Sequence, residues 1–472
     1  MNFDFDDLIC SISTPQGVGA IAIIRISGKG AKKILEDIFF PATKIKNDSI
    51  EPRKAYYGQI ANGNTVIDEV VVTWFKTPNS YTGDDVIEIG CHGSLYVQRQ
   101  LMQLLIKKGC RTAKPGEFTM RAFLNGKMDL TQAEAVADLI HSRNEMAHKI
   151  AMSQIKGSFS KRLTQLSDKL LNLISLVELE LDFSDEDVEF ADRNTLRMLI
   201  DELQREITSL YDSYALGQAI KDGVPVVIVG QPNAGKSTLL NKLLKEERAL
   251  VSDIPGTTRD AIEDTISIDS IEFRFIDTAG LRKTGDTIEK LGIERSIDKV
   301  TKAWIIIFLF DTTSDINEIK HACELVTTNI ANNNNSVIFV ANKVDLLPEN
   351  DLKSKIDSIS NSINIQQSEI VLISAKKEQQ IDTLINKLIT IAKGLIPSED
   401  SIIVHNTRQY ELLMKILVAI GSAIEAVENN MSGDLLAFEL RKVLSLMGEL
   451  TGIVISPDMI LENIFKNFCI GK

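Results

Sequence analysis

The sequence predicts a multidomain chain with an N-terminal α+β part, an all-α part, and an α/β part whose sheet is mostly parallel. Residues 1–119 hold short β-branched runs separated by Gly, Pro and Asn. Residues 120–217 and 398–472 repeat apolar side chains at the helical spacings of three and four. Residues 218–397 alternate apolar runs with helical segments, a pattern typical of parallel strands joined by right-handed crossovers.

Length and composition agree with several globular domains. The 472 residues suggest about three domains, and 44% hydrophobic with 25% charged residues is ordinary globular usage. This composition excludes a mainly disordered chain, a collagen-like chain and a disulfide-stapled miniprotein. The five scattered cysteines form no CxxC pair, so we expect reduced thiols and no structural zinc site.

No segment is expected to cross a membrane or to direct secretion. The longest apolar run near the middle of the chain, Ala303–Phe310, is far shorter than the ~20 residues that a span needs. The N-terminus, MNFDFDD, lacks the basic start and apolar stretch of a signal peptide. We therefore predict a cytoplasmic protein.

The N-terminal part is predicted to contain strands at 20–27 and 69–75 and a helix over about 95–108. The strands predicted for the α/β part are 225–229, 273–276, 304–310, 337–340 and 370–373.

Long helices are predicted over 120–217, interrupted by the acidic run Asp182–Glu189, and again over 410–428, 435–450 and 457–468. Because helical sequence flanks the α/β part on both sides, we favour one helical domain into which the α/β domain is inserted. Two separate helical domains are the alternative. The expected segments are 1–119, 120–217 (helical, first part), 218–397 (inserted) and 398–472 (helical, second part).

The segment GQPNAGKS (230–237) fits the phosphate-binding pattern GxxxxGK[ST] between a predicted strand and a predicted helix. A glycine-rich turn exposes successive backbone N–H groups, and the helix N-terminus adds positive potential. Lys236 can reach the β- and γ-phosphates, and the Ser237 hydroxyl can bind Mg²⁺. These features predict a nucleotide-binding site.

Four further motifs follow in the order typical of GTP-binding domains. DTAG (277–280) fits DxxG, NKVD (342–345) fits NKxD, SAK (374–376) fits the last guanine loop, and GTTRD (256–260) stands where a first switch belongs. The Asp345 carboxylate can accept two N–H bonds from guanine, a donor pair that adenine lacks. The sequence therefore predicts a GTPase.

The catalytic group is less obvious from the motifs. Many GTPases orient the attacking water with a Gln after DxxG, but Leu281 follows here and cannot orient water. Asp286, Glu289 and Glu294 are acidic candidates nearby. From the residues alone, each of the three could be the catalytic acid or simply a solvated charge on the surface.

Segments outside the nucleotide motifs carry a resemblance to a known family. They are AIIRISG (22–28), PNSYTGDDVIEIGCHGS (78–94), PGEFTMRAFLNGKMDLTQAEAV (115–136), LDFSDED (181–187), IEKLGIERS (288–296) and the terminal FCIGK. Together with the five motifs, they make the chain similar, nearly end to end, to the MnmE (TrmE) family of tRNA modification GTPases.

This resemblance implies an N-terminal domain that binds folate and dimerises, a helical domain, and an inserted Ras-like P-loop G domain. It implies a homodimer that works with an FAD-dependent partner, MnmG (GidA), in a heterotetramer or larger complex. Together they would add a carboxymethylaminomethyl or aminomethyl group to C5 of the wobble uridine of certain tRNAs. The one-carbon unit would come from 5,10-methylenetetrahydrofolate or 5-formyltetrahydrofolate, and GTP hydrolysis would be required.

The resemblance also implies roles for single residues. Glu289 matches a catalytic acid that acts through a bridging water, and Arg282 matches a switch arginine. A K⁺ ion is implied at the nucleotide, where it drives pairing of two G domains. The implied metal ligands are Ser237 and Thr258 for Mg²⁺, and Asn233, Ser252, Ile254 and Thr257 for K⁺. The residues expected to bind GTP are Asn233, Ala234, Gly235, Lys236, Ser237, Thr238, Ser252, Asp253, Ile254, Pro255, Gly256, Thr257, Thr258, Asp277, Thr278, Ala279, Gly280, Asn342, Lys343, Asp345, Ser374 and Ala375.

Four residues match folate-binding positions of the family: Arg25, Glu88, Lys127 and Lys472. Cys469 belongs to a C-terminal motif that the modification needs, without an assigned chemical role. Read without the family, the four are surface or strand-end charges, and Cys469 is an exposed thiol. Ser94 and Gln409 depart from the family's usual Gly and His, but neither stands at a matched ligand position.

Two other functions stay open beside the tRNA-modifying GTPase. One is a GTPase similar to ribosome-assembly GTPases, which switches a partner without taking part in its chemistry. The other is a folate-dependent enzyme that its G domain only regulates. Measuring folate binding would distinguish the partner-switching GTPase from the tRNA-modifying GTPase. Analysis of tRNA nucleosides would distinguish the folate-dependent enzyme from it.

The charge distribution bears on the tRNA partner. The chain has a net charge of −13, of which 1–119 carries +1, the two helical stretches together −10, and 218–397 carries −4. Polyanion binding usually leaves a basic footprint. We therefore expect modest tRNA affinity from this chain alone, with the flavoprotein partner supplying most of the basic surface.

Overall fold

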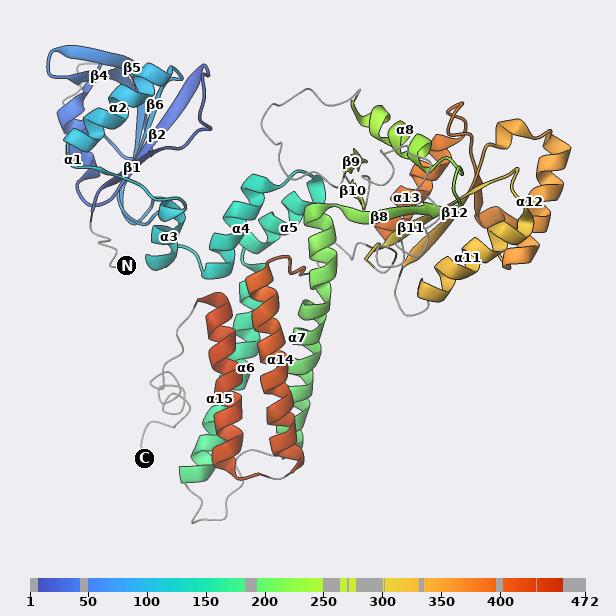
Figure 1. Cartoon of the computed structure of the whole chain (residues 1–472). Coiled ribbons are helices and arrows are strands. Elements are labelled where there is room, and N and C mark those ends of the chain that lie inside the picture. Colours follow the sequence, from blue (N-terminus) through green and yellow to red (C-terminus); the bar gives the residue numbers. More distant parts are fainter. Residues whose placement is uncertain are drawn as a thin grey trace. The chain divides into compact units, whose positions relative to one another are not determined.

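The structure is a computed structural model of the whole chain (Figure 1). It describes residues 7–42, 50–182, 193–248, 264–269, 271–276, 300, 302–330, 335–395, 402–429 and 431–452. The chain divides into two compact units. The first holds Met1–Ala137, Gln154–Ser167 and Met447–Pro457, and the second holds Asp138–Ser153, Asp168–Leu446 and Asp458–Lys472. The four segments expected from the sequence are a different division, and their boundaries stay predictions.

The first unit is built on a seven-stranded sheet in the order β3-β4-β5-β6-β2-β1-β7. Its strands are β1 Ile9–Ile12, β2 Ile21–Ser27, β3 Phe39–Pro41, β4 Ala55–Asn62, β5 Thr65–Phe75, β6 Val86–His92 and β7 Arg111–Thr112. Neighbouring strands are antiparallel except β1 and β7, which are parallel. The predicted strands at 20–27 and 69–75 are confirmed within β2 and β5.

Alternation along β2 separates the two faces of this sheet. Ile24 and Ile26 are fully buried in the core with α1 (Ala31–Ile38) and α2 (Leu95–Lys107). Successive side chains on a strand point to opposite faces, so Arg25 lies on the face away from that core. Exposed apolar side chains gather on the same face, at Ile21, Tyr57 and Val71.

Short helices follow the sheet: α3 (Glu117–Leu124) and α4 (Leu130–His141). The start of α4 is fixed by a reciprocal capping box. The Gln132 N–H donates to Asp129 Oδ1 (3.0 Å), and the Asp129 N–H donates to Gln132 Oε1 (2.9 Å). This satisfies two backbone donors that the first helical turn leaves without partners.

The second unit contains a helical bundle and an α/β domain. The bundle consists of α7 Arg193–Asp222, α14 Thr407–Glu428 and the greater part of α6 Ser158–Asp182 and α15 Gly433–Thr451, whose residues 158–167 and 447–451 belong to the first unit (Figure 1). The shorter α5 Glu145–Ile155 packs at the end of α7. Leu196, Ile200 and Leu203 of α7 are buried at spacings of four and three, as the helical pattern predicted. The predicted helices at 410–428 and 435–450 are confirmed as α14 and α15, while 457–468 lies outside the described residues. No helix in the described part of the chain is both long and apolar enough to cross a membrane.

The α/β domain has a six-stranded sheet in the order β13-β12-β11-β8-β10-β9. Its strands are β8 Val224–Gly230, β9 Asp264–Ile268, β10 Ile271–Phe275, β11 Ile305–Asp311, β12 Ser336–Asn342 and β13 Ile370–Leu372. All pairs are parallel except β9 with β10. The mostly parallel sheet is therefore confirmed, and all five predicted strands lie in it. The antiparallel edge strand β9 was not predicted.

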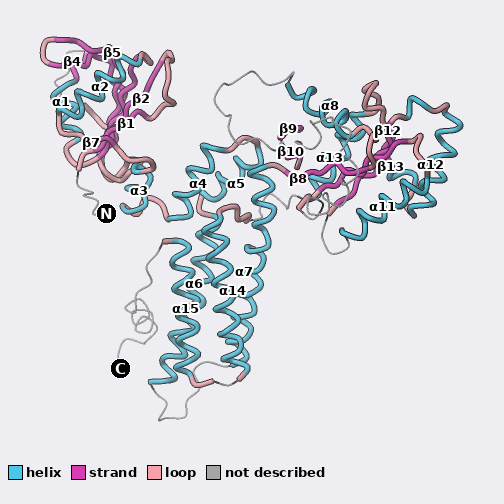
Figure 2. The backbone as a smooth tube through the Cα atoms, viewed as in Figure 1, coloured by secondary structure: helices cyan, strands magenta, loops and turns pink. Residues whose placement is uncertain are grey.

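Helices cover both faces of this sheet (Figure 2). They are α8 Lys236–Arg248, α11 Ile316–Ile330, α12 Glu349–Ile363 and α13 Ile381–Leu395. Val226 and Ile228 of β8 pack in the core with α8 and α13, whereas Val227 and Val229 pack in the core with α11 and α12. Burial on both faces explains why these strands are continuous apolar runs rather than alternating ones.

Candidate functional site

The phosphate-binding loop joins β8 to α8. Gly230 has φ 151° and Gly235 has φ 99°, conformations that favour glycine. A Cβ at Gly230 would clash with the Leu309 carbonyl oxygen, and a Cβ at Gly235 would clash with the Asn342 side chain. Asn233 also has a positive φ, 60°, in the middle of the loop. The two glycines therefore let the loop lie close to the neighbouring strands.

Lys236 begins α8 and folds across this loop. Its Nζ donates to the carbonyl oxygens of Gly230 (3.0 Å) and Gln231 (2.7 Å). Ser237 and Thr238 follow in the first turn of α8, where backbone N–H groups and the helix dipole favour an anion. The loop thus combines a cation, the N-terminal turn of a helix and a hydroxyl that is a suitable hard ligand for Mg²⁺.

Asn342 links the phosphate-binding loop to the last guanine loop. It is buried, and its Nδ2 donates to the Ala234 carbonyl oxygen (2.7 Å) while its Oδ1 accepts from the Ala375 N–H (2.9 Å). One side chain therefore holds together loops from three points in the sequence. These predicted residues converge at the carboxyl ends of β8, β12 and β13, the edge where ligands bind in open parallel sheets.

Asp345 stands beside this junction with an ionised carboxylate. Ser374 Oγ donates to its Oδ1 (2.7 Å), and Lys377 Nζ lies 3.3 Å from its Oδ2. The Ser374 hydroxyl, helped by Lys377, holds the pKa of Asp345 below its usual range. An ionised carboxylate only accepts hydrogen bonds, which suits the two N–H donors of guanine. The sequence predicted Asp345 and Ser374 but missed Lys377.

A second group of predicted residues meets on the open face of the N-terminal sheet. Arg25 Nε and Nη2 both donate to Glu88 Oε1, at 3.0 and 2.7 Å. The Arg25 guanidinium carbon lies 5.4 Å from the Tyr81 ring centre and 5.6 Å from the Phe118 ring centre. The sequence did not single out these two rings, because only the fold brings residues 81 and 118 to Arg25.

Lys127 borders the same region through a loop. Its Nζ donates to the Pro78 carbonyl oxygen (3.0 Å), in the loop that also carries Tyr81. The Tyr81 hydroxyl is in turn hydrogen-bonded to Thr119 Oγ1 (2.8 Å). Lys127 therefore contacts the loop that carries Tyr81, which lies against Arg25, and its hydrogen bond is to that loop rather than to the Arg25–Glu88 pair.

Several predicted residues lie outside the described part of the chain. They are Ser252, Asp253, Ile254, Pro255, Gly256, Thr257, Thr258, Asp277, Thr278, Ala279, Gly280, Arg282, Asp286, Glu289, Glu294, Cys469 and Lys472. Their assignments stay predictions. Cys10, Cys91, Cys110 and Cys323 are described, and all four are buried free thiols.

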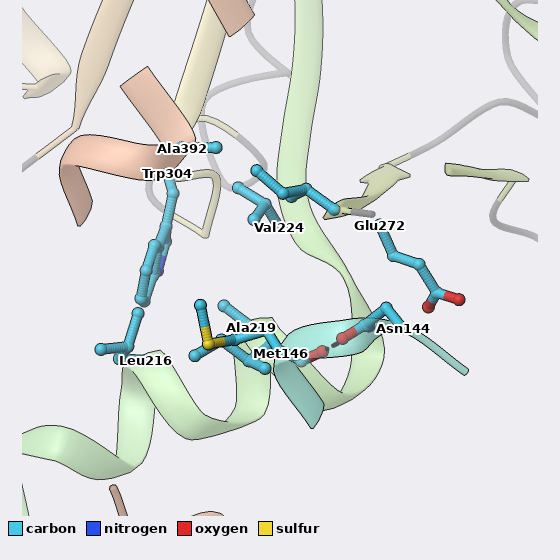
Figure 3. Close-up of a pocket in the computed structure, with 10 residues that line it drawn as sticks. Asn144, Met146, Leu216, Ala219, Val224, Glu272, Trp304 and Ala392 are labelled. Carbon is cyan, nitrogen blue, oxygen red and sulfur yellow. Dashed lines mark hydrogen bonds between the residues drawn. The ribbon is translucent and has the colours of Figure 1, made fainter. Parts of the chain in front are cut away.

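A small cavity where α7 leads into β8 is no candidate for either ligand. It is lined mainly by apolar side chains, including Met146, Leu216 and Val224, and Figure 3 shows the Trp304 ring pointing toward Leu216. Its volume is about 20 Å³, room for roughly one water molecule. We regard it as loose packing at the joint between the bundle and the α/β domain.

Comparisons with known proteins agree with the motifs. A family model described as "MnmE helical domain" matches residues 130–469, and one described as "GTP-binding protein TrmE N-terminus" matches residues 8–127. The chain is 50% identical over 467 residues to the tRNA modification GTPase MnmE of Bacteroides thetaiotaomicron, covering 99% of both chains. It is 47% identical over 479 residues to the protein of that name from Flavobacterium johnsoniae, again covering 99% of both chains.

A solved structure of Era from Aquifex aeolicus, bound to GDP and aluminium fluoride, is 31% identical, with 41% of this chain and 66% of that chain covered and a TM-score of 0.28. The assignment does not depend on it. Because two family models and full-length relatives at about half identity agree, the chain belongs to the MnmE (TrmE) family of tRNA modification GTPases.

Proposed function

We propose that this chain hydrolyses GTP as part of the modification of wobble uridine in tRNA, using a one-carbon unit from a tetrahydrofolate. GTP binding is supported above all by Asn342, which joins the phosphate-binding loop to the guanine loop beside an ionised Asp345. That arrangement suits a guanine nucleotide, with Lys236 at the phosphates and Asp345 at the base. Family membership supports the tRNA substrate.

The metal ions of this proposal fit the loop residues. Ser237 would hold Mg²⁺ together with Thr258, and the exposed Asn233 would hold K⁺ with Ser252, Ile254 and Thr257. Bound K⁺ would supply positive charge where many GTPases use an arginine finger. Glu289 would orient the attacking water, with Arg282 nearby in the switch region.

The ion assignment is tested by the GTPase rate in K⁺ and in Na⁺. We expect a sharply higher rate in K⁺, and equal rates would refute the K⁺ site.

Glu289→Ala should largely abolish hydrolysis while GTP still binds. Near-normal turnover of that variant would move the catalytic role to another residue.

The folate site would lie on the open face of the N-terminal sheet. Among the described residues, both bonds from Arg25 go to Glu88 Oε1, so Oε2 can accept N–H donors from a pterin ring. Tyr81 and Phe118 offer flat surfaces for stacking. Lys127 and Lys472 would meet the negatively charged glutamate tail, and Cys469 would act in the modification step.

Titration of the full-length protein with 5-formyltetrahydrofolate tests this site. Arg25→Met should weaken binding by about tenfold or more, because it leaves the Glu88 carboxylate without its cation. Arg99→Met is the matched control, since Arg99 is exposed on α2, which packs on the opposite face. No saturable binding by the wild type, with GTP binding intact, would favour the GTPase that only switches a partner.

The tRNA step is tested in cells. Deleting the gene should remove the aminomethyl-type modification from wobble uridine. An unchanged nucleoside profile would favour the folate enzyme that its G domain only regulates.

The proposed assembly is a homodimer joined by the FAD-dependent protein MnmG. The exposed Ile21, Tyr57 and Val71 on the open sheet face support self-association there. The acidic helical segments support a division of labour in which the partner supplies most of the basic surface for tRNA. Tight, salt-sensitive tRNA binding by the isolated protein would contradict that division.

A further inference from the structure

Asp311 ends strand β11 and belongs to none of the five nucleotide motifs. Strand register pairs it with Asn342, the first residue of NKVD. Only 8% of the surface of Asp311 is exposed to solvent. A carboxylate buried this deeply needs partners that compensate its charge.

Those partners connect Asp311 to the guanine motif. Its Oδ2 accepts from Lys343 Nζ (2.6 Å), and its Oδ1 accepts from the Thr313 N–H (2.8 Å) and Thr313 Oγ1 (2.7 Å). The intervening Thr312 donates through its N–H to the Asn342 carbonyl oxygen (3.1 Å) and through Oγ1 to the Lys343 carbonyl oxygen (3.2 Å).

Lys343 is thereby held at both ends. Its backbone is left-handed, with φ 64° and ψ 32°, and its carbonyl oxygen is bound by Thr312. Its ammonium group is bound by Asp311. In sequence it stands between Asn342, which binds the phosphate loop, and Asp345, which faces the base. Its aliphatic stem is therefore fixed where the two halves of the nucleotide site meet.

We propose that Asp311 is a positioning residue for guanine-nucleotide binding, because it holds Lys343 in place before the nucleotide arrives. A long lysine side chain loses rotamer freedom when a ligand orders it. A lysine that is already ordered loses less, so the nucleotide binds more tightly. This inference rests on the proposed GTP site and adds a residue outside its motifs.

A double-mutant cycle on the full-length protein tests the inference. The affinity for GDP is measured by calorimetry for the wild type, Asp311→Asn, Lys343→Met and the double variant. Asp311→Asn should bind about 3- to 10-fold more weakly, the loss expected for ordering one flexible side chain. If Asp311 acts through Lys343, the double variant should match Lys343→Met within about twofold.

Thr313→Ala is the matched control, because it removes a side-chain bond to the same carboxylate but leaves the bond to Lys343. It should bind GDP within about twofold of the wild type. In GTP turnover, Asp311→Asn should raise KM and leave kcat unchanged, a split that general damage to the domain would not give.

Three results would overturn the inference. They are wild-type affinity in Asp311→Asn, losses that multiply in the double variant, or an equal loss in Thr313→Ala. A wild type that binds no guanine nucleotide would overturn the proposed GTP site as well, so the two failures can be told apart.

Discussion

At the scale of single residues, the proposed selection of guanine rests on Asp345. Its carboxylate is oriented by Ser374 Oγ and lies within 3.3 Å of Lys377 Nζ. Guanine presents N–H donors at N1 and N2, and an anion that only accepts hydrogen bonds is matched to both. An amide at the same position would carry one acceptor and one donor group, and so would match a different base.

Asp345→Asn should therefore change the nucleotide that binds. We expect GTP affinity to fall at least about 100-fold, because the amide N–H₂ faces the guanine amine and leaves polar groups unpaired. Xanthosine triphosphate has a carbonyl oxygen in place of that amine, so it should bind the variant better than GTP does. Calorimetric titration of the wild type and the variant with each nucleotide measures the affinities directly. Asp382→Asn, an exposed change on α13, is the control, and undiminished GTP binding by Asp345→Asn would contradict the assignment.

The motif residues could be predicted because each motif keeps its working groups within a few positions. Gly235, Lys236 and Asn342 occupy their motif positions, and Asn342 Nδ2 donates to the Ala234 carbonyl oxygen of the phosphate-binding loop. Asp311 could not be predicted, since its link to Lys343 depends on the register of β11 against β12. The contact of Tyr81 with Arg25 likewise depends on the folded loop.

At the scale of elements, periodicity predicted most helices and strands but not the edge strand β9. Its five residues, Asp264–Ile268, pair antiparallel with β10 through a short turn. Strand and turn together are rich in Asp, Ser and Thr, so the apolar signal is weak. Tertiary pairing, rather than the local pattern, makes this segment a strand.

Helix α3 is held to the sheet by a buried ionic network. The Glu117 side chain is 1% exposed, and its carboxylate accepts from Arg111 at 2.6 and 3.0 Å, from the Lys114 N–H at 2.7 Å and from Arg121 at 3.2 Å. Burial by itself raises the pKa of Glu117, but these bonds outweigh it and lower the pKa to about 2. The ionised form therefore stabilises the folded state.

Glu117→Gln should destabilise the N-terminal part by about 3 kcal/mol at pH 7. The variant removes the buried anion that pairs with Arg111 and with the buried Arg121, so these two arginines share only the carboxylate of Asp7. The folded pKa of Glu117 is depressed, so its contribution is full above the unfolded pKa and declines as the pH falls from about 5 toward 2. The difference in the free energy of unfolding between wild type and Glu117→Gln should therefore become smaller as the pH falls.

This dependence can be followed with one tryptophan. The chain has two, so Trp304→Phe leaves Trp74, in the N-terminal sheet, as the reporter of urea unfolding. Wild type and Glu117→Gln are compared in that background at pH 7 and at about pH 3.5. If the difference in unfolding free energy is the same at both pH values, the ionised Glu117 carboxylate does not stabilise the folded state.

At the scale of the whole molecule, the sequence predicted an α/β domain inserted into helices but not how its two connections are secured. Asp138 of α4 binds both of them. Its carboxylate accepts from Lys221 (2.8 Å), at the end of α7 where the chain enters the domain, and it is hydrogen-bonded to His405 Nε2 (2.8 Å), where the chain returns. Gln218 of α7 also donates to the His405 carbonyl oxygen (2.7 Å). These residues are too far apart in sequence for any local pattern to connect them.

Asp138→Asn should loosen the returning connection without harming the nucleotide site. Burial raises the pKa of Asp138, but the bonds from His405 and Lys221 outweigh it and lower the pKa to about 2, so at neutral pH the variant loses an anion that holds both connections. We expect amide hydrogen exchange over residues 402–410 to accelerate by at least about tenfold, as local opening becomes easier, while exchange in the phosphate-binding loop and GDP affinity stay unchanged. Asp212→Asn, an exposed change on α7, is the control and should leave exchange as it is. Unaltered exchange over 402–410 in Asp138→Asn would mean that packing alone, such as the close approach of Gly217 to Val404, holds the joint.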